Sequence, residues 1–206
     1  MKIGNIGRLD PSLKEKGISG LTHGAKLEEE VWEMFTDDPD GLSYESEQLI
    51  AKLAKLDLLD KVDLTNLPDG IDKEVVVKQR VNQGFFRAAV LSSYNYRCCI
   101  SGITTPQLIE ACHISGWAND IMNRTNPTNG LCLNSLFHKA YDAHLISISP
   151  DLTVGVSDIL IDQTMDEETK KYLKSLRGRH MSLPNKFSPN KGLLEEHYIA
   201  FKQNGR

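Results

Sequence analysis

The sequence predicts an α+β protein with a mainly helical N-terminal region, a small strand-containing core and flanking C-terminal helices. Three observations lead to this class. Apolar residues make up 40% and charged residues 25% of the 206 residues, which is ordinary for a folded chain. Apolar side chains recur at helical spacing in the N-terminal region and again near the C-terminus. Between these regions, short apolar runs alternate with clusters of Gly, Pro and Asn, a pattern typical of strands and turns.

Residues 1–72 are predicted to form an acidic, mainly helical region. The first 24 residues are rich in Gly, Ser and Pro without a sustained period, so we expect an extended arm. Residues 27–35 predict a short acidic helix, and a second helix should begin at a Ser43 cap. The apolar stripe of this second helix comprises Leu49, Ile50, Leu53 and Leu56. Residues 65–72 (TNLPDGID) predict a turn-forming linker at the end of this region.

The second domain is predicted to comprise residues 73–206, with a motif core at 97–150. Residues 75–94 predict a helix. Its buried side is expected to carry Val81, Phe85, Ala88, Ala89 and Leu91. Two short strands around a turn at 102–106, and then a loop, are expected next. These strands span 97–103 and 108–117, and the loop spans 123–130.

The rest of the second domain predicts helices and one hairpin. Residues 131–143 have a helical pattern. Residues 145–149 and 153–156 predict the two strands of a hairpin across a Ser-Pro-Asp turn. Two C-terminal helices are expected near 166–176 and 191–203.

The net charge of −4 is an average over two unlike parts. Residues 1–72 hold 8 basic and 16 acidic side chains, a net charge of −8, whereas residues 73–206 carry +4. Residues 170–206 hold 9 basic and 2 acidic side chains, and the basic ones are densest between 170 and 180. Such a segment could follow the phosphates of a nucleic acid, and a solvated helix face is the alternative.

Composition also bears on the compartment. No apolar run approaches the ~18 residues that would span a membrane, and residues 1–5 lack the apolar core of a secretory signal. The four cysteines, Cys98, Cys99, Cys112 and Cys132, are too sparse for a disulfide scaffold. We therefore expect a protein of the reducing cytosol, with a cytoplasmic location and no membrane partner.

The middle of the chain carries a His–Asn–His–Asp pattern. His113 closes a predicted strand, Asn129 follows sixteen residues later, and His138 nine residues after that. His138 and Asp142 are four residues apart, so on a helix both side chains lie on one face. An imidazole and a carboxylate on adjacent turns can share one divalent cation. This mixed ligation suits Mg²⁺, Mn²⁺, Ni²⁺ or Zn²⁺ without selecting among them.

This pattern resembles the HNH endonuclease family, the ββα-metal nucleases, over residues 78–150. The resemblance is closest to a bacterial group with a Gln-x-x-Phe-Arg helix ahead of the motif, matched here by Gln83-Gly84-Phe85-Phe86-Arg87. The motif is matched by Glu110-Ala111-Cys112-His113, by Asn129-Gly130-Leu131-Cys132-Leu133 and by His138-Lys139-Ala140-Tyr141-Asp142. The resemblance implies a ββα-metal nuclease core and a bacterial restriction, phage-defence or mobile-element setting.

The resemblance further implies a metal-dependent endonuclease that hydrolyses DNA phosphodiester bonds. His113 takes the place of the general base that removes a proton from the attacking water. Asn129 takes the middle position, where its amide ties down the loop and orients His113. His138 completes the catalytic motif, and both His138 and Asp142 take the positions of metal ligands. One divalent cation would stabilise the leaving 3′-oxygen, so the expected products bear 5′-phosphate and 3′-hydroxyl ends.

Two features depart from many family members. Many place Asp or His just before the base as a further metal ligand, whereas this chain has Cys112. A thiolate there could bind a soft metal, and a buried strand cysteine is otherwise inert packing. Many relatives also hold a structural zinc between two Cys-x-x-Cys pairs, but Asn134 and Phe137 stand at the second pair's positions. We therefore expect no structural zinc.

DNA is the expected partner, and several basic residues are candidates for phosphate contacts. Arg80, Arg87 and Arg124 are candidates near the motif, with bracing of the nuclease core as the alternative role. In the C-terminal run the candidates are Lys170, Lys171, Lys174, Arg177 and Arg179. The histidines outside the motif, His23, His144, His180 and His197, are expected to be surface or core residues, and His144 lies close enough to the site for an indirect role.

Two other hypotheses stay open. The fold could serve as a non-catalytic module that binds nucleic acid or a partner protein, although all four core positions are intact. The acidic residues 1–70 could instead cover the basic surface and hold the nuclease inactive. Double-strand cutting from one site per chain would favour a homodimer, but no feature of the sequence specifies an interface.

Overall fold

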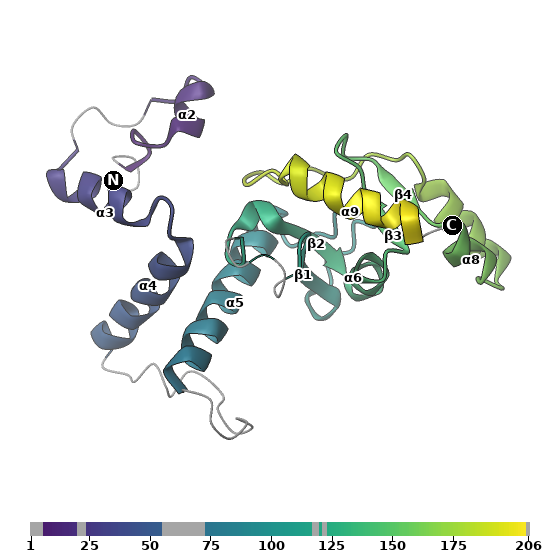
Figure 1. Cartoon of the computed structure of the whole chain (residues 1–206), viewed down its shortest axis with the longest axis horizontal. Helices are drawn as coiled ribbons and strands as arrows, with labels where there is room; N and C mark the ends of the chain where they lie inside the picture. Colours follow the sequence, from purple (N-terminus) through teal and green to yellow (C-terminus); the bar gives the residue numbers. More distant parts are fainter. Residues whose placement is uncertain (1–5, 20–23, 55–72, 117–119, 121–122, 205–206) are drawn as a thin grey trace. The chain divides into compact units, whose positions relative to one another are not determined.

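The computed structural model describes residues 6–19, 24–54, 73–116, 120 and 123–204 (Figure 1). These residues form an α+β protein with helices and two two-stranded sheets, as predicted. The chain divides after Lys78 into two compact units, so the break falls inside a helix. The predicted linker at 65–72 and residue Leu56 lie outside the described residues, and the predicted domain boundary stays a prediction.

The first unit begins with a short helix where an extended arm was predicted. Helix α2 spans Pro11–Glu15. It ends in a Schellman motif, in which Gly17 has φ +70° and the N–H of Ile18 donates to the carbonyl of Leu13 at 2.9 Å. The prediction of an extended arm was wrong here because five residues are too few to produce a periodic apolar pattern.

Two longer helices complete the first unit. Helix α3 spans Lys26–Phe35, as predicted, and helix α4 spans Pro39–Leu53. Asp38, not Ser43, caps α4: its carboxylate accepts a hydrogen bond from the Gly41 N–H at 2.8 Å, and Pro39 occupies the first helical position. The predicted apolar stripe lies on one face, but this face is exposed at Leu49, Ile50 and Leu53.

Helix α5, Lys73–Ser93, leads into the second unit. Three of its buried residues, Asn82, Phe86 and Val90, are spaced four residues apart. The predicted helix is confirmed, but most of its predicted buried side was wrong: Leu91 is buried, Ala88 is exposed, and Val81, Phe85 and Ala89 are half-buried. Because apolar residues are adjacent along α5, the sequence is compatible with more than one choice of buried helix face. Tertiary packing decides which face is buried.

The central sheet pairs two strands far apart in the sequence. Strand β1, Ile109–His113, follows the 3₁₀ turn η2, Pro106–Leu108, and runs antiparallel to strand β2, Gly130–Asn134. The predicted first strand at 97–103 was wrong: its residues form a turn in which the Gly102 N–H donates to the carbonyl of Cys98 at 2.9 Å.

A helix was predicted at 131–143, but its first residues, 131–134, belong to strand β2. Helix α6 spans Ser135–Asp142, and the Asn134 side chain caps it by accepting from the Phe137 N–H at 2.8 Å. The whole of β2 is buried. A short, fully buried apolar run lacks a period that distinguishes a strand from a helix, which explains the wrong assignment.

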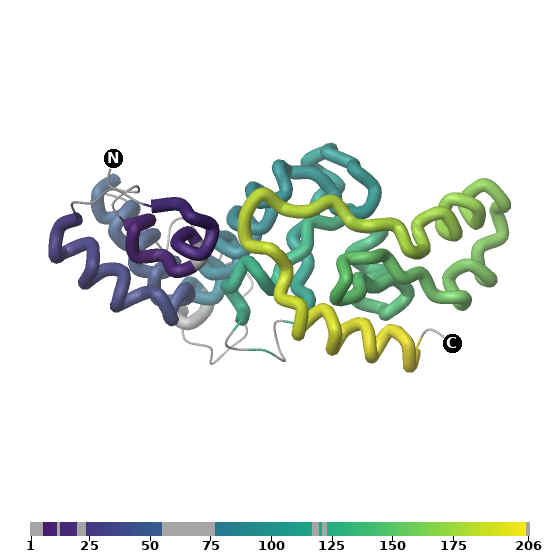
Figure 2. Tube along the Cα trace, turned by 90° about the horizontal axis from the view of Figure 1, so that it is seen from above, coloured from purple at the N-terminus to yellow at the C-terminus, as the bar shows by residue number. Residues whose placement is uncertain are grey.

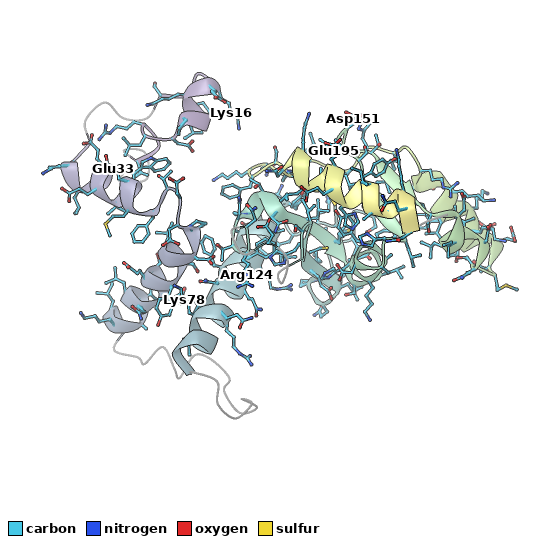
Figure 3. All side chains as sticks on the ribbon, in the orientation of Figure 1. Lys16, Glu33, Lys78, Arg124, Asp151 and Glu195 are labelled. Carbon is cyan, nitrogen blue, oxygen red and sulfur yellow. The ribbon has the colours of Figure 1, made fainter. Side chains whose placement is uncertain are left out.

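The hairpin and the C-terminal helices agree with prediction. Strands β3, Ile146–Ile148, and β4, Val154–Val156, pair antiparallel, and Figure 3 labels Asp151 in the turn between them. Helix α8 spans Glu167–Leu176 and helix α9 spans Lys191–Asn204. The five-residue helix α7, Asp158–Asp162, was not predicted.

The segment 177–190, between α8 and α9, makes backbone hydrogen bonds to several other elements of the second unit. Figure 2 shows it running back along this unit before α9 begins. Its backbone N–H groups donate to carbonyls of distant elements: Met181 to Leu152 at 2.9 Å, and Ser182 to Cys99 at 2.8 Å. These bonds tie the C-terminal helices to the hairpin and to the turn ahead of β1.

One hydrophobic core runs between the central sheet, α6 and the hairpin. Its largest fully buried side chains include Tyr141, Phe86, Phe137, Ile109 and Leu131. All four cysteines are buried as free thiols. Within the described part of the chain, no helix combines the length and apolar character needed to cross a membrane.

Two glycines offer a matched test of this packing. A Cβ at Gly130 would lie 2.2 Å from the Val90 side chain, whereas a Cβ at Gly84 meets nothing within 4 Å. We expect Gly130→Ala to lower the free energy of unfolding by about 1–3 kcal/mol, since α5 must move away from β2. Gly84→Ala should raise it by roughly 0.5–1 kcal/mol, because alanine favours a helix interior. Urea denaturation measures both, and a Gly130→Ala variant as stable as the wild type would contradict the packing.

Acid should destabilise the fold through His197, which is buried in α9. Burial, and then the nearby His144, lower the pKa of His197 from its ordinary 6.5 to about 4. The unfolded chain therefore binds a proton that the fold excludes, and stability falls as pH drops from 6.5 to 4, by roughly 3 kcal/mol from this group. Urea titrations across this range should show a shallower pH dependence for His197→Gln. Identical pH profiles for both proteins would refute the expectation.

Candidate active site

His113 lies at the end of β1, opposite Gly130 in the register. Its ring stacks on Phe86 of α5, with centroids 3.7 Å apart and planes at 7°. The Nε2–H donates to the backbone carbonyl of Arg124 at 2.9 Å, because a carbonyl can only accept. A neutral ring with its proton on Nε2 has Nδ1 as its basic nitrogen. Burial lowers the pKa of His113, which favours this neutral form.

Asn129 holds the loop that follows β1. Asn129 is the last residue of the 3₁₀ turn η3, Pro127–Asn129, and its side chain is fully buried. The amide oxygen accepts from the Ser115 N–H at 2.8 Å, and the amide nitrogen donates to the carbonyls of Ser115 and Asn123, each at 3.1 Å. The backbone carbonyl of Asn129 accepts from the Ile114 N–H at 2.8 Å. These bonds fasten the residues next to His113 without touching its ring nitrogens.

His138 lies between two carboxylates. Its Nδ1–H donates to Glu110 of β1, and its Nε2 lies 3.5 Å from Asp142 Oδ2, one helical turn further along α6. The hydrogen bond from His138, and a second one from Ser135, lower the pKa of Glu110. The Asp142 side chain is 64% exposed, so a ligand from solvent can reach it. The imidazole is therefore oriented from one side and open toward Asp142 on the other.

Glu110 belongs to the motif, but no role was predicted for it. The signal that could have found it is strand alternation, because Glu110 and Cys112 are two residues apart on β1 and share a face. That face lies against α6, which carries His138. A carboxylate behind a metal-binding histidine fixes the ring's tautomer and orientation.

Cys112 lies beside this pair. Its Sγ is 3.9 Å from Asp142 Oδ1 and 3.4 Å from the carbonyl oxygen of His113. Burial, and then the charge of Asp142, raise the pKa of the thiol well above its ordinary value. Cys112 is therefore a neutral thiol, and a thiol is a much weaker metal ligand than a thiolate.

A cleft of about 590 Å³ joins these groups. His113, His138 and Asp142 line it from the central motif, and Glu196 and His197 line it from α9. The side chains of the base position and of the metal-binding positions thus share one cavity, although they come from different elements. The contribution of α9 to the cleft was not predicted.

The basic candidates have different surroundings. Arg87 donates to the carbonyl of Ile109 at 3.0 Å, and Arg177 donates to the carbonyl of Val156 and to Asp158, so both connect neighbouring elements. Lys170 pairs with Glu167 at 2.8 Å. Figure 3 labels Arg124, the loop residue whose carbonyl meets His113. Arg80, Lys171, Lys174 and Arg179 are exposed to solvent.

Comparison with known proteins agrees with this geometry. Residues 98–149 have a nuclease-type fold: they match the family HNH endonuclease. The matched segment contains β1, β2, α6 and β3. No curated protein matches the chain. The Gln-x-x-Phe-Arg helix lies ahead of the matched residues, so membership of that bacterial group stays a prediction.

The donor atoms suit the divalent cation that the family implies. Cys112, His138 and Asp142 each offer one atom, and these atoms all lie within 4.8 Å of one another. The bond from His138 Nδ1 to Glu110 leaves Nε2 as the coordinating nitrogen, next to the carboxylate of Asp142. An imidazole nitrogen with a carboxylate oxygen is a suitable donor set for a divalent metal.

Removing the Asn129 side chain should destabilise the loop measurably. We expect Asn129→Ala to lower the free energy of unfolding by about 2–3 kcal/mol, because three hydrogen bonds disappear and buried backbone groups lose their partners. The matched control is Asn185→Ala, an exposed residue with one side-chain hydrogen bond, to Asn95 at 3.1 Å. That control should change stability by less than about 0.5 kcal/mol. Equal urea midpoints for the two variants would contradict the assigned role of Asn129.

Proposed function

We propose that this protein is a metal-dependent HNH endonuclease that hydrolyses DNA phosphodiester bonds. The observation that carries the proposal is the shared cleft, in which His113 faces the same space as His138 and Asp142. A phosphodiester held there would meet a base and a cation-binding pair together. The family match of residues 98–149 supports the same reaction class.

His113 acts as the general base. With Nε2–H held by the Arg124 carbonyl, Nδ1 takes the proton from the attacking water. The lowered pKa keeps the ring unprotonated at neutral pH, which is the form that can accept a proton. The stack on Phe86 and the bonds of Asn129 keep the ring and the following loop in place.

His138 and Asp142 would hold one divalent cation, with Glu110 orienting the imidazole. When bound, such a cation supplies Lewis-acid stabilisation of the scissile phosphate and of the leaving 3′-oxygen. The donors from these two residues are one imidazole nitrogen and one carboxylate oxygen, beside the Cys112 sulfur. An imidazole with a carboxylate suits Mg²⁺, Mn²⁺, Ni²⁺ or Zn²⁺.

The exposed cations of the second unit would bind the DNA backbone. Lys171, Lys174 and Arg179 project from α8 and from the turn after it, within the segment of highest positive charge. Lysine and arginine contacts to phosphates release counterions, so they supply affinity that depends on salt. Arg80 on α5 is a further candidate of the same kind.

A plasmid assay separates the two roles. We expect His113→Ala to slow Mn²⁺-dependent nicking of supercoiled plasmid by about 10²–10⁴-fold, with the calorimetric Kd for Mn²⁺ unchanged. His138→Ala and Asp142→Ala should instead raise that Kd, because each removes a ligand. The control is His180→Ala, an exposed histidine outside the cleft, which should nick at the wild-type rate.

Several outcomes would contradict the proposal. Unchanged nicking by His113→Ala would remove it as the base, and wild-type Mn²⁺ affinity in both other variants would remove them as ligands. Plasmid binding by the wild-type protein without any chelator-sensitive cutting would favour the non-catalytic module.

A further inference from the structure

The last helix carries a buried histidine that reaches the metal-binding end of α6. Leu194, His197 and Phe201 form the buried face of α9, and His197 is 8% exposed. It lies outside residues 98–149, the segment matched by the family. A buried imidazole is costly unless its nitrogens find partners, so its contacts are informative.

Both ring nitrogens of His197 are satisfied in one neutral tautomer. Nε2–H donates to the backbone carbonyl of Tyr141 at 3.1 Å, because that carbonyl can only accept. Nδ1 then accepts from the hydroxyl of Ser147 in β3 at 2.8 Å. The ring connects α6 to the hairpin through two hydrogen bonds.

The bond to Tyr141 acts on the peptide unit that precedes Asp142. The carbonyl of Tyr141 and the N–H of Asp142 belong to one planar group, so fixing the carbonyl fixes the plane from which Asp142 projects. This carbonyl lies in the last turn of α6, and it also accepts from the backbone N–H groups of Ala143 and His144, the latter at 2.9 Å. His197 thus adds a side-chain hydrogen bond to the turn that carries Asp142.

Stacking holds the side chain of Tyr141 as well. The rings of Tyr141 and His197 lie 3.7 Å apart with planes at 9°. Within the described part of the chain, the buried Tyr141 hydroxyl has no hydrogen-bond partner. Its own hydroxyl therefore does not anchor this ring, and the imidazole face supplies a contact that does.

We propose that His197 is a positioning residue for the metal-binding carboxylate: through the Tyr141 carbonyl and ring, it sets the orientation of Asp142. This inference rests on the proposed function, because it assigns His197 a role in cation binding at the same site. It extends the functional unit beyond the HNH domain to α9. Without α9, the sequence motif would be intact but the last turn of α6 would lack this support.

The test compares two His197 variants of the full chain by calorimetric titration with Mn²⁺. His197→Phe keeps an aromatic ring against Tyr141 but removes both hydrogen bonds. We expect it to weaken Mn²⁺ binding by about tenfold, the smaller end of the effect of losing a residue that orients a metal ligand. His197→Gln places an amide N–H near the position of Nε2, so it should recover most of this affinity.

Leu194→Ala is the control for a purely structural role. Leu194 is fully buried on the same face of α9, so its truncation should lower the melting temperature at least as much as His197→Phe does. It should leave the Kd for Mn²⁺ within about twofold of the wild type, because a leucine side chain has no donor for a hydrogen bond to the Tyr141 carbonyl. Titrations are run well below the melting temperature of each variant.

A double-mutant cycle tests whether the effect passes through Asp142. In an Asp142→Asn background, adding His197→Phe should cause little further loss of affinity. The proposal is overturned if His197→Phe binds Mn²⁺ like the wild type, if Leu194→Ala loses as much affinity, or if the two losses multiply in the cycle. Wild-type protein that neither binds Mn²⁺ nor nicks plasmid would instead defeat the proposed function, and the positioning role with it.

Discussion

The antiparallel register of β1 with β2 is the constraint on which the candidate site depends. It places His113 opposite Gly130, where an added Cβ would collide with Val90 of α5. It also starts α6 directly after β2, so His138 lies over the β1 face that carries Glu110. A slip of one residue would turn every β1 side chain to the other face and separate the base from the metal-binding pair.

Three histidines of the second unit have different roles because their surroundings differ. His113 stacks on an apolar ring and gives its one proton to a carbonyl, so it is neutral and basic at Nδ1. His138 lies between two carboxylates, which directs its Nε2 toward the proposed cation site. His197 is buried and both of its ring nitrogens are hydrogen-bonded, so its proposed role is to position neighbouring groups. Burial and the identity of each neighbour, not the residue type, distinguish the proposed base, the proposed ligand and the proposed positioning residue.

Several features were predictable because they depend on local chemistry. The hairpin of β3 and β4 follows from two short apolar runs around a Pro-Asp turn. Helices α3, α8 and α9 follow from apolar residues at helical spacing. The spacing of the HNH motif predicted His113 and His138 as site residues, and in the structure both line one cleft. The assigned chemical roles of these residues follow from that pattern together with the family resemblance.

The sequence by itself determined the class of fold, the spacing of the motif and the hairpin, since each depends on residues close together in the chain. Tertiary packing decided the rest. The strand identity of β2, the buried phase of α5 and the Asp38 cap depend on which neighbours cover each residue. The contacts of Glu110 and His197 could not be predicted for the same reason. Their partners, His138 and Tyr141, lie 28 and 56 residues away in the chain, and a local sequence pattern does not report contacts over such separations.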